Sequence, residues 1–223
     1  WQTIAEGRIL NKCEMFNTDY DVFGINPVIP GGARSSSAEY MNFLRMITND
    51  GIYNGEQVLS SQSIQEFFTN QTAGLPIYWS PFPYAHPDYP YSANVLRYGF
   101  GAWIFAENPA TNQVEEITSP GAWGSFPWAD KKRNISGIIF TFVPVYLGGF
   151  ERTLHTNLAL IKLVRQIIDS TGDINLDNEI NVLDVVLAVS FILNGEYNEL
   201  GDLNNDGSVD VLDVVIIVNI IIS

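Results

Sequence analysis

Two segments near the end of the chain carry oxygen-bearing side chains at a spacing that suits a metal ion. Each segment has such side chains at positions 1, 3, 5 and 12 of a twelve-residue stretch. They are Asp173, Asn175, Asp177 and Asp184 in the first, and Asp202, Asn204, Asp206 and Asp213 in the second. In a calcium loop this spacing points alternate side chains at one hard cation, and the last carboxylate closes the shell. Glu179 and Ser208, at position 7, would add backbone carbonyls. The sequence therefore predicts two Ca²⁺ sites.

The two segments are copies of one unit. Residues 172–193 and 201–222 are identical at 11 of 22 aligned positions, and each acidic stretch runs into an apolar helix, Val182–Leu193 or Val211–Ile222. Position 6 needs a left-handed backbone and holds Gly207 in the second copy but Asn178 in the first, so the first site should be weaker. Ordinary acidic turns without a metal are the alternative, because Asp and Asn also favour turns. Repetition in register favours the calcium loop.

The negative charge of the chain is concentrated in this tail. Residues 171–223 contain 10 of the 25 acidic residues and none of the 11 Lys and Arg, within a net charge of −14. Closely spaced carboxylates repel one another, so we expect the tail to be ordered by Ca²⁺. The acidity argues against nucleic acid and anionic membrane surfaces as partners. No apolar run is long enough for a membrane span. Asp213 and Asn219 interrupt the final helix, which we interpret as buried core.

Over residues 172–222 the tail resembles a type I dockerin. The resemblance implies a non-catalytic module that docks a secreted enzyme onto a cohesin. It also implies that loop positions 10 and 11 contact the partner. Those positions are apolar here, where many cellulosomal dockerins carry a small hydroxyl residue: Val182, Leu183, Val211 and Leu212. We therefore expect a cohesin-like partner or sorting machinery, with a self-contained stabilising role as the alternative.

The elements that precede the tail predict an α+β domain. Ser36 to Glu39 form a capping box that starts a helix, which Asn49–Gly51 ends. A second helix begins near Ser61, and a proline- and aromatic-rich stretch follows over 72–97. The remaining elements are strands at Tyr98–Ala106, Gly124–Ala129 and Ile135–Val143, and a closing helix from about Thr153 to Ser170. The single cysteine, Cys13, is expected to be a buried hydrophobe.

Three motifs in residues 30–170 are similar to the C-terminal part of serine β-lactamases and penicillin-binding proteins, closest to the class C and esterase-like branch. They are Gly31–Tyr40, Tyr98–Gly101 and Ser119–Gly124. The resemblance implies a serine nucleophile in Ser-x-x-Lys, a tyrosine in Tyr-x-Asn, and a Lys/His-Thr/Ser-Gly triplet on an edge strand beside the site.

Only the third of these elements can be placed. Ser119-Pro120-Gly121 stands where the triplet belongs, and the resemblance makes the Ala122 N–H half of an oxyanion hole. Ser119 and Pro120 replace the basic and hydroxyl residues that hold a substrate carboxylate, which favours an uncharged ester or amide. A tight strand entry without catalytic meaning is the alternative.

The nucleophile itself is missing. No Lys of the chain has a serine three residues before it. Tyr40-Met41-Asn42 matches Tyr-x-Asn, but Tyr40 lies on the apolar stripe of its helix and is interpreted as core. His86 and His155 have no serine beside them in sequence and are interpreted as solvated or packed. The chain alone is expected to be inactive.

The expected organisation is a partial serine-hydrolase domain over residues 1–170, with an antiparallel sheet flanked by helices, and a small all-α calcium-binding domain over 171–223. Such a protein would be the C-terminal portion of a secreted hydrolase. The proline-rich stretch 72–97 would wall the pocket or pack over the sheet. The competing hypothesis is a non-catalytic binding or structural protein with a degenerate hydrolase scaffold.

Overall fold

The computed structural model describes residues 1–20, 22–23, 26–27, 31–72, 75, 77, 80, 82, 97–108, 110–149, 151–177 and 179–222. Most of the proline-rich stretch, His86 and Asn178 lie outside the described residues, and so do residues 28–30 of the loop over 27–32. The chain divides into two compact units, Trp1–Leu158 and Ala159–Ser223. The division falls within helix α4 (Glu151–Ser170).

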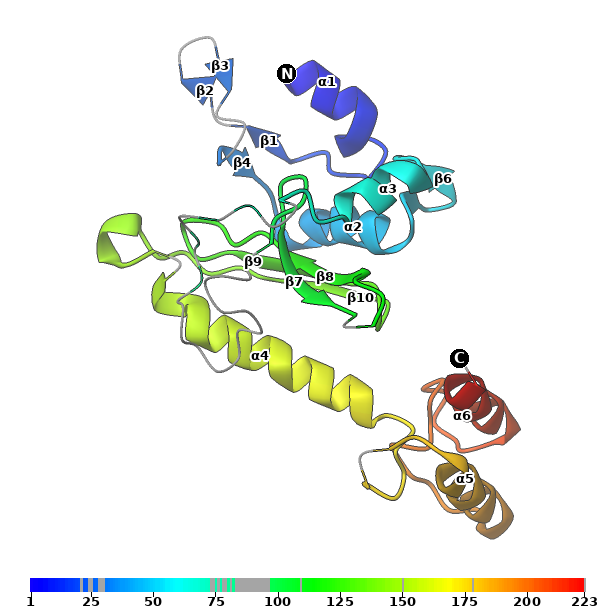
Figure 1. Ribbon diagram of the computed structural model, residues 1–223. Coiled ribbons are helices and arrows are strands. Elements are labelled where there is room, and N and C mark those ends of the chain that lie inside the picture. Colours follow the sequence, from blue (N-terminus) through cyan, green and yellow to red (C-terminus); the bar gives the residue numbers. More distant parts are fainter. Residues whose placement is uncertain are drawn as a thin grey trace. The chain divides into compact units, whose positions relative to one another are not determined.

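An antiparallel sheet organises the first unit (Figure 1). Its order is β10-β9-β8-β7, a simple meander in which each strand pairs with the next along the chain. The strands are β7 (Trp103–Glu107), β8 (Val114–Thr118), β9 (Phe126–Asp130) and β10 (Ile135–Ile139). The α+β prediction is thereby confirmed, and three of the four strands were predicted.

Strand β8 is the one that the sequence pattern does not indicate. Its sequence, Val-Glu-Glu-Ile-Thr, places two acids side by side, which hides the alternation of a half-buried strand. In the structure Val114, Glu116, Ile117 and Thr118 are all buried. Thr118 Oγ1 donates to the Pro127 carbonyl at 2.6 Å. With β7 and β9 on its two sides and four of its five residues buried, β8 is an inner strand.

Helices pack on the sheet as the apolar periodicity predicted. Helix α2 (Ser37–Thr48) packs on β9 and β10, and α3 (Ser61–Phe67) adds the buried Ile64 to the same core. Figure 1 shows α2 and α3 on one side of the sheet and the first turns of α4 on the other. Leu154, Leu158 and Ile161 of α4 are buried, as expected.

Short elements cover the remaining edge of this unit. Helix α1 (Gln2–Ala5) continues into a π-helical turn, η1 (Glu6–Leu10). Three two-residue hairpin pairs follow: β1 (Asp19–Tyr20) with β4 (Ala33–Arg34), β2 (Val22–Phe23) with β3 (Asn26–Pro27), and β5 (Ile52–Tyr53) with β6 (Glu56–Gln57).

The predicted capping box of α2 forms only in part. Ser36 Oγ accepts the Glu39 N–H at 3.2 Å, as expected. Glu39 instead accepts from the Asn17 backbone and side chain at 2.9 and 2.8 Å, and from Thr18 Oγ1 at 2.6 Å. The Thr18 hydrogen bond is the main reason that the pKa of Glu39 is lowered. Glu39 therefore ties the N-terminal segment to α2.

The second unit contains α5 (Val182–Asn194) and α6 (Val211–Ile222), each preceded by an acidic loop. A small core of Ile174, Ala188, Val209 and Ile217 joins the two halves. The interpretation of the final helix as buried core is wrong: of its residues, only Asp213 and Ile217 are buried, and several large apolar side chains are exposed. In the part of the chain that the structure describes, no helix is both long and apolar enough to cross a membrane.

Candidate functional site

The second acidic loop is held together by hydrogen bonds from its own backbone. The two carboxylate oxygens of Asp202 accept the N–H groups of Asp206 and Gly207 at 3.1 and 3.0 Å. Asn204 Oδ1 accepts the Asp206 N–H at 2.9 Å, and Asp206 Oδ1 accepts the Ser208 N–H at 3.0 Å. Alternate side chains at positions 1, 3 and 5 therefore turn back over the loop, as the spacing predicted.

Asp213 closes this loop from the first turn of α6. Its Oδ1 accepts the N–H groups of Leu203 and Asn204 at 2.8 and 3.1 Å, and its Oδ2 accepts that of Asp210 at 2.8 Å. The carboxylate is buried. A buried carboxylate is stable where several N–H donors surround it, so Asp213 fastens both ends of the loop to the helix.

The first loop repeats the closing hydrogen bonds of the second. Asp184 Oδ1 accepts from the Ile174 and Asn175 N–H groups at 2.8 and 3.2 Å, and Oδ2 accepts from Asn181 at 2.9 Å. Asp173 Oδ1 accepts the Asp177 N–H at 3.1 Å, the counterpart of the bond from Asp206 to Asp202. The internal repeat of the sequence is thus a repeat of local structure.

The left-handed residues of the loops were predicted only in part. Gly207 has a φ of +89°, as position 6 requires. Position 4 is also left-handed in both loops, at Leu176 (φ +59°) and Asn205 (φ +57°). Asn205 could have indicated a left-handed backbone from the sequence, because asparagine is enriched at positive φ. Leu176 could not, because leucine rarely adopts positive φ.

The donor set of each loop fits a hard cation. Each loop offers three Asp and one Asn side chain at the expected positions. A carboxylate has about four lone-pair sites, so Asp184 and Asp213, which accept three N–H groups each, keep one site for a metal. Hydrogen bonds from Ser208, then Asn204, lower the pKa of Asp206, which favours its charged form. Among the described residues, no three His, Cys, Asp or Glu side chains come together as a metal centre. Calcium binding stays a prediction.

The side chains predicted to contact a partner are exposed. Val182 and Leu183 are 65% and 55% exposed at the start of α5, and Val211 and Leu212 are 66% and 57% exposed at the start of α6. They occupy equivalent positions of the repeat and lie next to the loop-closing Asp184 and Asp213.

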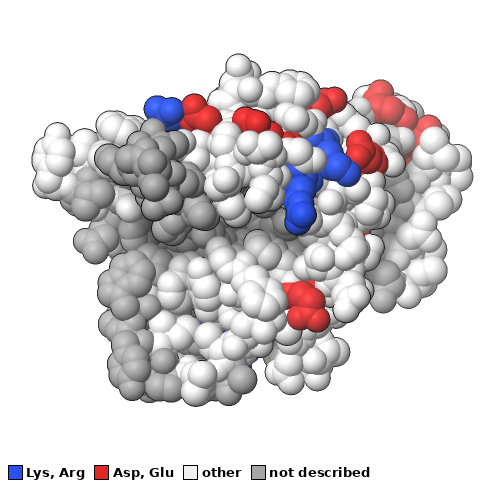
Figure 2. All heavy atoms as spheres, turned by 90° about the horizontal axis from the view of Figure 1, so that it is seen from above, with Lys and Arg blue, Asp and Glu red and all other residues white. Residues whose placement is uncertain are grey.

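A second candidate site is a wide cleft in the first unit, with a volume of about 1840 Å³. Ligand pockets commonly measure about 300–1,000 Å³, so this is an open groove rather than an enclosed cavity. Its walls come from α1 and η1, from the start of α2, from Ser119–Trp123 and from Phe140–Phe142. Most described residues on the face drawn in Figure 2 are neither acidic nor basic.

The predicted oxyanion segment lies in this cleft. Ser119, Pro120, Gly121 and Ala122 all line it. They follow the end of β8, an inner strand, so the triplet lies in the β8–β9 turn rather than on an edge strand. The Gly121 N–H donates to the Ser125 carbonyl at 2.9 Å, and the Gly124 N–H donates to the Gly121 carbonyl at 2.9 Å. A Cβ on Gly121 would lie 2.3 Å from Ser125 Oγ, so a larger residue there would require the Ser125 side chain to move.

The Ala122 N–H is available to a ligand. Ala122 is exposed, and no hydrogen bond between described residues uses its N–H. A backbone N–H that faces a cleft without a protein acceptor can donate to an oxyanion. Ser119, Gly121 and Ala122 are near neighbours in the chain and all line the cleft, and their catalytic role stays a prediction.

Tyr40 is placed differently from its prediction. It is half-buried and lines the cleft, with edge-to-face contacts to Phe43 and Phe140 at 5.9 and 6.1 Å between ring centroids. Burial raises the pKa of Tyr40, so its hydroxyl is neutral at physiological pH. Its assignment to the core is wrong, because the cleft opens beside α2. His155 is exposed on α4.

Comparison with known proteins identifies the fold of the chain but not its activity. No protein-family model and no curated protein matches the sequence. A crystal structure of a putative beta-lactamase from Bacteroides dorei is similar, with a TM-score of 0.55 and 19% sequence identity over 72% of this chain. This chain spans 50% of that protein. The likeness shows a β-lactamase-like fold, and at this identity it shows no more.

Proposed function

We propose that this chain is the C-terminal part of a secreted serine hydrolase that acts on uncharged esters or amides and carries a calcium-dependent docking module. The observation that carries the hydrolase half is the Ala122 N–H, which has no protein acceptor among the described residues and lies in a cleft of a β-lactamase-like fold. The nucleophile would come from upstream of Trp1, because no Ser-x-x-Lys occurs in the chain.

The chemistry proposed for the cleft is acyl transfer. A serine attacks the substrate carbonyl, and negative charge develops on the carbonyl oxygen. The Ala122 N–H donates to that oxyanion as half of the hole. The hydrogen bonds through Gly121 and Gly124 hold this N–H in place before the substrate arrives, so little reorganisation is needed. Ser119 and Pro120 offer no positive charge at the triplet position, which favours a substrate without a carboxylate at that point.

Substitution at Ala122 tests this role in the protein extended by its upstream region. Ala122→Pro removes the N–H, and loss of one such donor typically lowers kcat by about 10²–10³. Ala122→Gly keeps the N–H and is the matched control. Hydrolysis of p-nitrophenyl esters and of a chromogenic lactam is the assay. Equal rates for the two variants would exclude the oxyanion role, and absence of hydrolysis in the extended wild type would exclude the hydrolase.

The tail is proposed to bind one Ca²⁺ in each loop. The ion would supply the positive charge that offsets the crowded carboxylates, while Asp184 and Asp213 hold each loop to its helix. The exposed apolar positions beside them, Val182, Leu183, Val211 and Leu212, would contact a cohesin-like domain or a component of sorting machinery. These side chains support docking because they are apolar, exposed and repeated.

Titration calorimetry tests the calcium sites. The wild type should bind two Ca²⁺, and Asp184→Ala and Asp213→Ala should each lose one binding event. Glu196→Ala, an acid of the same unit outside both loops, is the control and should keep both. Unchanged stoichiometry in both Asp variants would contradict the assignment.

The second candidate function is a non-catalytic binding protein with a degenerate hydrolase scaffold. The absence of Ser-x-x-Lys from the chain favours it. Sequencing the upstream coding region separates the two. Ser-x-x-Lys at a helix start, followed by Tyr-x-Asn, would favour the enzyme, and the absence of both would favour the binding protein.

A further inference from the structure

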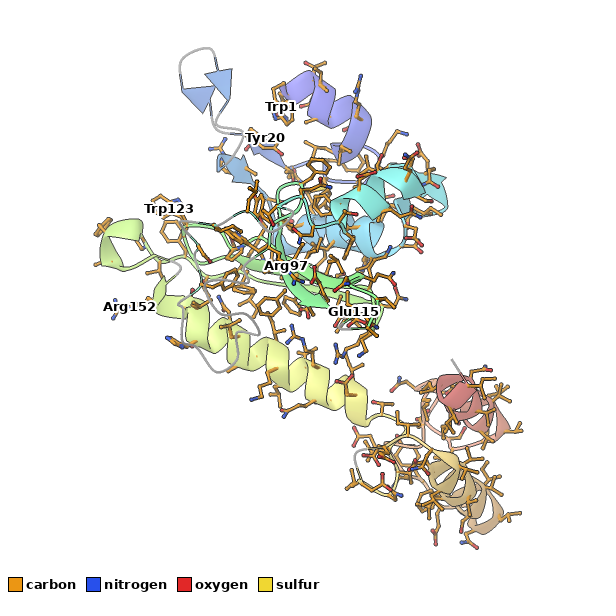
Figure 3. The ribbon with its side chains drawn as sticks, in the orientation of Figure 1. Trp1, Tyr20, Arg97, Glu115, Trp123 and Arg152 are labelled. Carbon is orange, nitrogen blue, oxygen red and sulfur yellow. The ribbon has the colours of Figure 1, made fainter. Side chains whose placement is uncertain are left out.

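Two exposed aromatic rings form a stacked pair beside the predicted oxyanion donor. The rings of Trp123 and Phe142 are stacked, with centroids 5.2 Å apart and planes only 13° from parallel. Both line the cleft, and they are 47% and 75% exposed. Figure 3 labels Trp123 in the first unit, on the segment between β8 and β9. Large apolar side chains that remain exposed together in a cleft indicate a surface that a ligand covers.

The backbone under these rings is rigidly held. The Val143 N–H donates to the Trp123 carbonyl at 2.8 Å, which joins the β8–β9 turn to the segment after β10. Thr141 Oγ1 donates to the Gly124 carbonyl at 2.7 Å. Gly124 has a φ of +108°, and a Cβ there would lie 2.3 Å from Thr141 Oγ1. The ring pair is therefore positioned in advance, which reduces the entropy lost on binding.

The surroundings of the pair are aromatic and free of negative charge. Phe140 and Tyr40 line the cleft, in edge contact with one another. No Asp or Glu is found among the described residues that line the cleft, and its charged lining residues are Arg8, Lys12 and Arg34. Trp123 directly follows Ala122 in the chain, and both residues line the cleft.

We infer that Trp123 and Phe142 form a binding platform for a planar aromatic ring in the acyl or leaving group of the substrate. This inference rests on the proposed function and narrows its substrate class to aromatic esters or amides. Stacking is favoured because an aromatic ring gains area burial and quadrupole contacts on a parallel pair, whereas a saturated ring of similar size gains burial alone.

Direct binding tests the platform without any catalysis. The probes are 2-naphthamide and cyclohexanecarboxamide, which share the amide and differ in ring planarity. Calorimetry on the chain should give tighter binding of 2-naphthamide, and Trp123→Ala or Phe142→Ala should weaken it about tenfold. Phe142→Trp should retain it. Phe16→Ala, at an exposed phenylalanine outside the cleft, should leave it unchanged.

Each outcome bears on the platform separately from the hydrolase. No binding of 2-naphthamide to the wild type, or equal affinities for the two probes, would overturn the platform. Equal affinity in wild type and both alanine variants would also overturn it, with thermal unfolding as the check that the variants fold. If the probe binds as expected while the extended protein hydrolyses nothing, the platform stands and the proposed hydrolase fails.

Discussion

Asp213→Ala should destabilise the tail far more than the loss of an exposed acid. The buried carboxylate accepts the N–H groups of Leu203, Asn204 and Asp210 at 2.8, 3.1 and 2.8 Å. A donor left without its acceptor costs about 1–3 kcal/mol when buried. These three donors are only partly buried, so we take about 1 kcal/mol each. The expected loss without calcium is then about 3 kcal/mol.

Calcium should enlarge this effect, because the same carboxylate is the expected closing ligand. A site held at a hundred times its Kd stabilises the folded state by about 2.7 kcal/mol. The variant should therefore lose about 6 kcal/mol in calcium and about 3 kcal/mol in chelator. Asn198→Ala is the matched control, since Asn198 accepts the Leu200 and Gly201 N–H groups at 2.9 and 3.1 Å but lies outside both loops. Its loss should be the same in both conditions.

Hydrogen exchange, measured by mass spectrometry on peptides from 203–222, reports the local stability of the second loop and α6 in the intact chain. Calcium should slow exchange of these peptides in the wild type and in Asn198→Ala, but not in Asp213→Ala. Equal protection by calcium in all three proteins would show that Asp213 is not a ligand. If Asp213→Ala loses less stability than Asn198→Ala in chelator, the estimate of about 1 kcal/mol for each N–H donor of Asp213 is refuted.

Three further predictions concern the first unit. Glu39→Gln should lower the free energy of unfolding, measured in urea, by about 2 kcal/mol at pH 7. Because the pKa of Glu39 is lowered in the fold, its stabilising contribution is present above about pH 4.3 and fades as the pH falls. The stabilities of the two proteins should therefore converge in acid. Gly137→Ala should cost about 1–3 kcal/mol in the same assay, because a Cβ would lie 2.2 Å from the Trp128 ring, while Gly31→Ala, with no atom within 4 Å, should be neutral. Cys13 should resist iodoacetamide at pH 8 until urea unfolds the protein, since burial raises its pKa to about 11; fast alkylation of the native protein would contradict this placement.

Local sequence signals predicted the elements well where the structure depends on neighbours in the chain. Helices α5 and α6 begin at the predicted residues, Val182 and Val211, and the acid at the third position of each closes its own loop. Ser36 caps α2 and Asn49 follows its last residue, as the short-range pattern indicated. The repeat of the acidic loops was also readable, since every partner of Asp184 lies within ten residues of it.

Signals failed where the partner is distant in the sequence. The sequence predicted Glu39 as half of a capping box. Its carboxylate instead accepts hydrogen bonds from Asn17 and Thr18, which are 22 and 21 residues away in the chain. The adjacent acids of β8 obscured its strand pattern in the sequence, and the segment is a strand because it pairs with β7 and β9. Tyr40 was predicted to be core because it lies on the apolar stripe of α2, but in the structure this part of the stripe lines the cleft.

The sequence by itself determined the two loop-helix repeats, because they depend on residue types at short fixed spacings. It also indicated the main helices and three of the four strands of the sheet, and the family resemblance placed the candidate oxyanion segment at Ser119–Ala122. The tertiary structure alone decided that this segment faces an open cleft, that Trp123 meets Phe142, and that the apolar faces of α5 and α6 are exposed. Those facts depend on which distant surfaces pack together, and no spacing along the chain encodes them.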